Sequence, residues 1–134
     1  MTDLEFMQRF EAATLSEAEF RHADHVRLAW LYLRGRAMLP ALTAFSEGLR
    51  NFAAAHGKSG RYHETITWAF MFLIRERMES SPSHADWRNF ARHNPDLLDW
   101  PQNILTHYYR PERLSTELAR RVFVLPEPFV CGPG

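Results

Sequence analysis

Hydrophobic residues recur along most of this chain every three or four positions, which is the spacing of one face of an α-helix. Residues 2–13 and 40–56 have polar residues between the apolar ones, as in half-buried helices. Residues 24–34 and 62–79 are apolar on nearly every side, which predicts that these two helices lie at the centre of the molecule. No alternating segment is long enough to compete as a strand. The sequence therefore predicts a compact, all-α single domain over residues 1–134, a bundle of five or six helices.

Capping residues set the predicted boundaries of these helices. Thr2 and Asp24 have side chains that accept hydrogen bonds from free N–H groups at a helix start. Gly35 and Gly57 suit the conformation that ends a helix, and Pro40 suits a first turn. Further helix starts are predicted at Ser16, at Ser83 with Asp86, at Pro101, and at Ser115 or Thr116.

Titratable residues gather where the two apolar helices are predicted to begin. The first stretch, residues 20–26, has two histidines three positions apart, His22 and His25. The second stretch, residues 56–65, contains His56 and His63. One amphipathic helix with short connectors separates the apolar helices, so antiparallel neighbours are expected. Two reversals of direction would leave the apolar helices parallel. We therefore expect both histidine stretches at the same end of the bundle.

Imidazoles at helix starts suggest two kinds of chemistry. The positive end of the helix dipole lowers their proton affinity, and neutral imidazole is the form that binds a metal or accepts a proton. His22 and His25 share a helix face, so with His63 they are candidate ligands of a divalent metal. His63 is also a candidate general base with Glu64 as its orienting carboxylate, which makes these two the candidate catalytic residues. Helix caps and hydrogen-bonded packing are the alternative roles for all four side chains.

Other polar residues could hold a small molecule at the same place. Arg21 and Arg61 flank the histidines and can pair with a carboxylate or a phosphate, although surface arginines are the alternative. His107 belongs to a later polar aromatic cluster that could reach the same pocket. Aromatic residues such as Trp68 are expected in the core, with some lining the pocket. The candidate ligand-binding residues are Arg21, His22, His25, Arg61, Tyr62 and His107.

Composition narrows the function classes. The formal net charge is zero, so the chain has no overall basic character to attract nucleic acid, and it carries no recognition motif. The longest apolar run, residues 68–74, is too short to span a bilayer. With one cysteine, Cys131, and no signal-peptide pattern, a cytoplasmic location is expected. The sequence leaves open whether the protein forms a homodimer. From about residue 125 we expect an extended Pro/Gly tail that packs through apolar residues; neither it nor Cys131 is assigned a role.

Four phrases along the chain resemble recurrent phrases of a known family. They are Phe20-x-His22-x-x-His25-Val26-x-x-Ala29, Tyr62-His63-Glu64-Thr65-Ile66-Thr67, Tyr108-Tyr109-x-Pro111-Glu112-Arg113-Leu114 and Ala119-Arg120-Arg121-x-Phe123-Val124. As a set they resemble a family of small, all-helical, mostly uncharacterised bacterial proteins, over most of the chain. The resemblance implies the helical fold and carries no catalytic assignment. The chain departs from the family in ending soon after Pro126 in a Pro/Gly tail.

Two function classes follow from these observations. The first is a small-molecule-binding protein or small enzyme with a polar His/Glu/Arg pocket at one end of the bundle, with a divalent metal as a candidate cofactor. As an enzyme it would transfer protons or hydrolyse its substrate, with His63 or a metal-bound water as base. The alternative is a non-catalytic interaction or regulatory module whose histidines are structural caps.

Overall fold

The computed structural model describes residues 1–80 and 86–128, and in this part of the chain every regular element is a helix. This confirms the predicted all-α class. Seven α-helices are present in the described residues, more than the five or six expected, because two of them have only four and five residues. The α-helices are α1 (Asp3–Glu11), α2 (His22–Leu33), α3 (Met38–Ala55), α4 (Glu64–Ser80), α5 (Trp87–His93), α6 (Pro111–Leu114) and α7 (Glu117–Arg121). Four 3₁₀ segments lie between them: η1 (Glu17–Glu19), η2 (Ser59–Arg61), η3 (Pro95–Leu98) and η4 (Ile104–His107).

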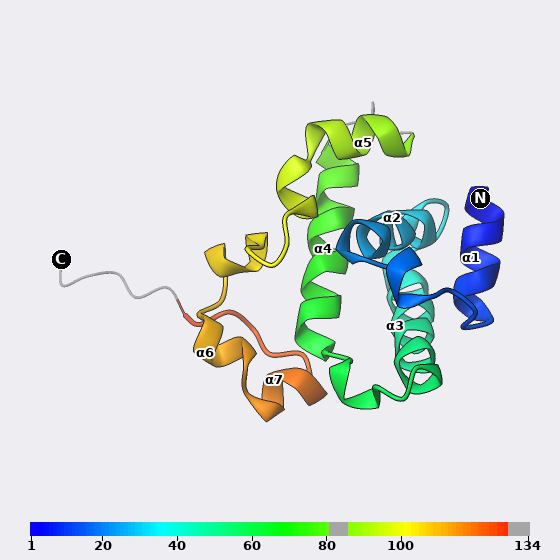
Figure 1. Cartoon of the computed structure of the whole chain (residues 1–134). Coiled ribbons are helices and arrows are strands. Elements are labelled where there is room, and N and C mark those ends of the chain that lie inside the picture. Colours follow the sequence, from blue (N-terminus) through cyan, green and yellow to red (C-terminus); the bar gives the residue numbers. More distant parts are fainter. Residues whose placement is uncertain (81–85, 129–134) are drawn as a thin grey trace.

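The centre of the molecule is formed by α2, α3 and α4, each of which contacts the other two. Helices α3 and α4 run antiparallel, and α2 lies across α4 (Figure 1). The expectation that α2 and α4 would be parallel is therefore wrong. Residues on all sides of α2 are buried, so this helix has no single apolar face that would fix its direction relative to one neighbouring helix. Helix α2 is accordingly enclosed by α1, α3, α4 and η3.

Helix α1 packs on α2 and α3 through two phenylalanines. Phe6 and Phe10 are buried, and the ring of Phe10 lies directly over Gly48 of α3. A Cβ atom at position 48 would lie 2.3 Å from Cε2 of Phe10, so the two helices can approach this closely only at a glycine. Leu4, an apolar residue of the same helix, is 65% exposed. Helix α1 therefore buries a narrower stripe than its apolar pattern predicted.

Thr65 connects the C-terminal segment to the first turn of α4. Its buried hydroxyl lies 2.7 Å from the carbonyl oxygen of Ala119 and 2.9 Å from that of Val122, and it accepts a hydrogen bond from the N–H of Val124 at 3.0 Å. The hydroxyl of Tyr109 also donates to the carbonyl oxygen of Val124, at 2.7 Å. These bonds hold α7 and the segment after it against α4.

Most of the predicted helix boundaries agree with the structure, and one that does not lies at the first histidine stretch. Gly35 and Gly57 have φ angles of 82° and 67° and follow the ends of α2 and α3, as predicted. Asp24 is not the N-cap of α2. The helix begins earlier, at His22, and the Asp24 carboxylate accepts the N–H of Arg21 at 3.0 Å from within the first turn.

Two other predictions about the second half of the chain fail. Pro101 does not open a helix; the next regular element begins at Ile104, after Asn103, whose side chain accepts the N–H of Leu105. Leu125, expected to pack on the body, is 69% exposed. Ser83, Phe129 and Cys131 lie outside the described residues. Within 1–80 and 86–128, no helix has both the length and the apolar character needed to cross a bilayer.

Candidate functional site

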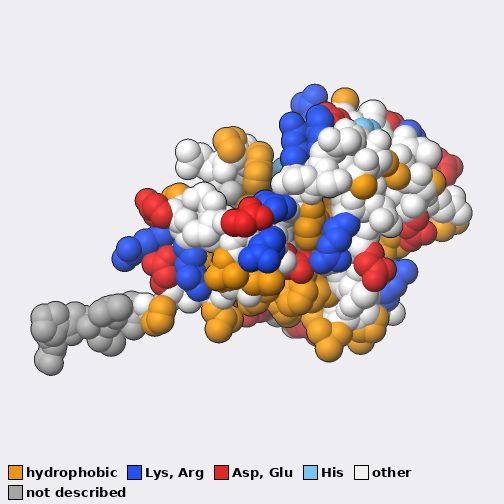
Figure 2. All heavy atoms as spheres, turned by 90° about the horizontal axis from the view of Figure 1, so that it is seen from below, with side chains coloured by type: hydrophobic (Ala, Val, Ile, Leu, Met, Phe, Trp, Pro, Cys, Tyr) orange, Lys and Arg blue, Asp and Glu red, His pale blue; other side chains and the backbone are white. Residues whose placement is uncertain are grey.

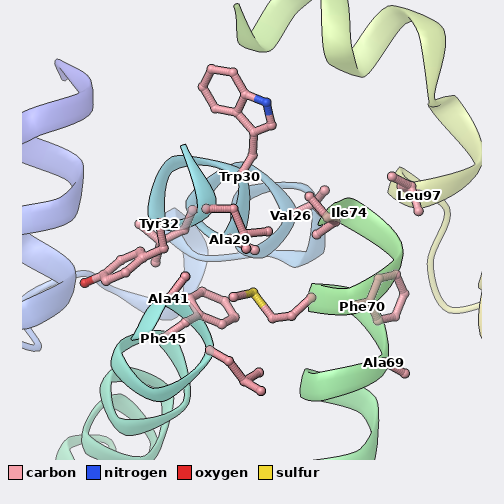
Figure 3. Packing of buried hydrophobic residues seen from close by; sticks show 14 of the residues in the cluster. Val26, Ala29, Trp30, Tyr32, Ala41, Phe45, Ala69, Phe70, Ile74 and Leu97 are labelled. Atoms are coloured by element: carbon pink, nitrogen blue, oxygen red, sulfur yellow. The ribbon is translucent and has the colours of Figure 1, made fainter. Parts of the chain in front are cut away.

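A cavity of about 580 Å³ lies beside the first half of α2, the second half of α3 and the first half of α4. Apolar side chains from all three helices form its walls. Among them are Val26 and Ala29 of α2, Phe45 and Leu49 of α3, and Phe70 and Ile74 of α4. Figure 3 shows how closely these walls approach one another where Val26 and Ala29 of α2 come near Ile74 of α4. The cavity is thus continuous with the hydrophobic core.

Four histidines also line this cavity: His22, His25, His56 and His63. The two histidine stretches therefore lie at one site, as the sequence suggested. They meet for a different reason, because α2 crosses the middle of α4 (Figure 1), where His22 meets Phe70 edge-on, and the cavity extends from there to His63 at the start of α4.

His63 is the N-cap of α4. Its Nδ1 accepts the N–H of Ile66 at 3.1 Å, and its Nε2 lies 2.7 Å from the carbonyl oxygen of Leu114. A nitrogen that accepts an N–H carries no proton, so Nδ1 is bare and Nε2 carries the hydrogen that it donates to Leu114. Both ring nitrogens are therefore bonded to the backbone. His63 ties α4 to α6 in this arrangement and has no nitrogen left for a proton or a metal.

Glu64 does not orient His63. Its carboxylate accepts two hydrogen bonds from the Arg50 guanidinium, at 2.8 and 3.1 Å, and another from the Tyr62 hydroxyl. The Arg50 guanidinium also lies 4.7 Å from the centre of the Tyr62 ring. The pKa of Tyr62 rises to about 12 because its hydroxyl is partly buried and donates to this carboxylate. The predicted catalytic pair is thus replaced by a Tyr62–Glu64–Arg50 group that joins α3 to α4.

His22 presents one face of its ring to an aromatic side chain and one nitrogen to the backbone. Its Nε2 donates to the carbonyl oxygen of Leu97 at 2.9 Å. The ring is stacked on Trp100 with centroids 4.7 Å apart and meets the Phe70 ring edge-on at 5.0 Å. Burial lowers the pKa of His22, and its hydrogen bond to Leu97 partly opposes that effect.

His25 is the most strongly perturbed of these histidines. Its ring is stacked on Phe20, with centroids 3.8 Å apart and planes inclined by 20°. Burial lowers its pKa to about 4, helped by the nearby His22 and opposed by a hydrogen bond to the backbone of Phe20. His25 is therefore neutral at neutral pH.

The charged groups lie at the rim of the cavity. Lys58 and Glu17 form an ion pair there, and Arg61 is exposed beside them. Of the candidate ligand-binding residues, His22, His25, Arg61 and Tyr62 line the cavity. Arg21 and His107 are exposed and are not among its lining residues, so the structure does not place these two at the site.

The proposed set of metal ligands, His22, His25 and His63, does not form in this structure. No three His, Cys, Asp or Glu side chains lie close enough together to hold a metal ion within the described ranges. The physical reason is the use of the ring nitrogens: both those of His63 and one of His22 are bonded to the backbone.

Sequence reasoning did not select His56 or Trp100 as site residues. His56 follows Phe45, Leu49, Phe52 and Ala53 on the same face of α3, so the apolar stripe of that helix, continued by one turn, could have identified it. Its Nε2 lies 3.0 Å from the carbonyl oxygen of Leu15. Trp100 lies in an irregular segment, where no periodic pattern indicates which side chains point inward.

The chain was compared with family models, with curated proteins and with solved structures, and it matches none of them.

Proposed function

We propose that this chain binds a small, mostly apolar molecule in the cavity between α2, α3 and α4. The observation that carries the proposal is a hollow of about 580 Å³ whose walls are largely apolar and aromatic, with neutral polar side chains among them and the charged ones at the rim. Binding sites for small molecules have this character and volumes of about 300–1,000 Å³.

An apolar ligand in this cavity would remove lining surface from water and gain contacts with the walls. Its binding would therefore stabilise the folded chain. The hydrogen bonds of His63 and Glu64 favour binding over the base-catalysed hydrolysis considered from the sequence. A bound divalent metal likewise receives no support from the arrangement of these side chains.

The proposal is tested by placing a larger side chain on α3, where it would fill part of the cavity. Ala53 lines the cavity, whereas its neighbour Ala54 is exposed and does not. We expect 2-fluoronaphthalene, a flat apolar probe, to bind the unaltered chain in a calorimetric titration. Ala53→Phe should weaken that binding by about tenfold or more, since the new ring would occupy the space of the probe. Ala54→Phe should leave it unchanged.

Absence of binding to the unaltered chain would contradict the proposal, as would equal affinities of the Ala53→Phe and Ala54→Phe variants. Thermal unfolding of each variant without the probe shows whether it is folded, so that weak binding is not mistaken for unfolding.

A second function class is favoured by a separate observation, the bonds between cavity histidines and the backbone. His22, His56 and His63 each pair with a carbonyl group of a distant segment, so they also stabilise the fold. A non-catalytic module with structural histidines would show this arrangement. Native mass spectrometry of the untagged protein, with elemental analysis of the same sample, separates the classes. A retained organic molecule supports the ligand site, and a stoichiometric metal would support the metal site considered from the sequence.

A further inference from the structure

Two imidazoles at the first turns of α2, those of His22 and His25, line the cavity and can each accept a hydrogen bond. A neutral imidazole has one N–H and one bare nitrogen. His22 uses its N–H on the carbonyl oxygen of Leu97, which leaves its Nδ1 bare. His25 is also a neutral imidazole at neutral pH, so one of its two ring nitrogens is bare. Each of the two rings therefore keeps a lone pair for a further partner.

The neighbouring polar rings supply no free donor. The hydroxyl hydrogen of Tyr62 is already given to Glu64, and both nitrogens of His63 are bonded to the backbone. Burial lowers the pKa of both His22 and His25, which keeps these rings neutral and able to accept at neutral pH. A partner that donates a hydrogen bond would complement the two neutral imidazoles, and the Thr67 hydroxyl, which also lines the cavity, can donate or accept.

The shape and charge of the lining restrict the partner further. Aromatic rings border the space, among them those of Phe20, Phe52, Phe70 and Trp100. Flat aromatic molecules pack well among such rings. The charged side chains of the lining, Glu17, Lys58 and Arg61, belong to residues around η1 and η2 at the rim, so a charge carried deep into the cavity would lose its hydration without an ion partner.

We propose that the cavity takes an uncharged aromatic molecule with an O–H or N–H group, of the phenol or indole class, which donates a hydrogen bond to His22 or His25. This inference rests on the proposed function, because it specifies the ligand class for the same cavity. The aromatic body occupies the space between α2, α3 and α4, and the donor group lies toward the two histidines at the first turns of α2.

Two probes of nearly equal shape test this inference. 2-Naphthol has an O–H group where 2-fluoronaphthalene has a fluorine atom, which donates no hydrogen. We expect the unaltered chain to bind 2-naphthol about tenfold more tightly in calorimetric titrations at neutral pH, the difference that one buried hydrogen bond provides.

Variants then locate the acceptor. His22→Phe and His25→Phe keep an aromatic ring in the stacks with Trp100 and Phe20 while removing the bare nitrogen. At least one of them should reduce the preference for 2-naphthol to about twofold or less and leave the affinity for 2-fluoronaphthalene within about twofold of its original value. His107→Phe is the matched control, because His107 is exposed and outside the cavity. It should keep the full preference.

The outcomes separate this inference from the proposed function. Equal binding of the two probes by the unaltered chain would overturn the donor requirement and leave the apolar pocket in place. A preference that survives in both His22→Phe and His25→Phe would also overturn it, since the acceptor would then be another group. Failure of both probes to bind would overturn the proposed function together with the inference.

Discussion

At the scale of single residues, the environment of His25 links the cavity to pH. Its pKa in the folded chain is about 4, whereas an exposed histidine titrates near 6.5. Between these two values the unfolded chain binds a proton that the folded chain does not, so the free energy of unfolding decreases as the pH falls. Above the higher value the ring is neutral in both states and contributes no pH dependence.

We predict that the unaltered chain loses up to about 3 kcal/mol of stability from His25 alone as the pH falls through this range, since each pH unit between the two pKa values contributes about 1.4 kcal/mol. His25→Phe should remove this part of the pH dependence and keep the stack on Phe20. Urea unfolding of both proteins at about pH 7 and about pH 4.5 measures the difference. The same decrease in both proteins would show that His25 is not buried in its neutral form.

His63 and Glu64 show how far residue chemistry alone can be interpreted. Their types and their position at a helix start were identified correctly from the sequence, and so was the structural alternative for them. Their partners could not be identified, because Leu114 and Arg50 are 51 and 14 positions away in the chain. Whether such a histidine acts as a base or as a helix cap depends on its hydrogen-bond partners, and these are known only from the folded structure.

At the scale of elements, the contact between α1 and α3 depends on Gly48. A glycine within a helix costs about 1 kcal/mol relative to alanine, so Gly48→Ala would stabilise an isolated α3. In the folded chain the added Cβ would overlap the buried Phe10 ring, 2.3 Å from Cε2. We predict a net loss of about 1–3 kcal/mol in the free energy of unfolding, as for overpacked cores.

Gly60→Ala is the control for this change. A Cβ atom at position 60 meets nothing within 4 Å, so the alanine should change stability by no more than about 0.5 kcal/mol. Chemical denaturation of the two variants measures both effects. A Gly48→Ala variant as stable as the original chain would mean that α1 is not held against α3 in this way.

The connection between α4 and the C-terminal segment depends on the Thr65 hydroxyl. Thr65→Val keeps the shape of the side chain but leaves the N–H of Val124 and the carbonyl oxygens of Ala119 and Val122 without that partner. We expect a loss of about 2–3 kcal/mol, because buried groups would become unsatisfied. Amide hydrogen exchange should increase selectively over residues 117–124.

Thr67→Val serves as a comparison, since Thr67 lies two residues later on α4 and lines the cavity instead. Its amide exchange over residues 117–124 should match that of the original chain. Equal protection of this segment in Thr65→Val would contradict the role assigned to Thr65.

At the scale of the whole molecule, the periodic pattern was sufficient for the fold class and for the central position of α2 and α4, whereas α3, predicted as a half-buried helix, also belongs to the centre. Capping residues located most helix ends, because caps are local chemistry. The direction of α2 could not be predicted, since the sequence of a helix that is apolar on nearly every side does not indicate to which neighbouring helix it runs parallel. Trp100 could not be placed either, because irregular segments have no period.

The meeting of the two histidine stretches was predicted, and the character of the site was not. The sequence suggested a polar His/Glu/Arg pocket at one end of a bundle. The cavity instead has mainly apolar walls, with Glu64 in contact with Arg50 and the charged groups at the rim.

Hydrophobic side chains also lie on the outer surface of the molecule. Figure 2 shows the underside of the molecule, where hydrophobic side chains gather next to charged ones.

The central claim is that the cavity between α2, α3 and α4 holds a small aromatic molecule. The most direct measurement is a crystal structure of the protein grown with 2-bromonaphthalene, whose bromine is located by its anomalous signal. We predict a bromine peak beside Ala29, Phe45 and Phe70, and its loss in crystals of Ala53→Phe. A bromine found only on the outer surface, or a cavity closed by its own side chains in the presence of the probe, would contradict the claim.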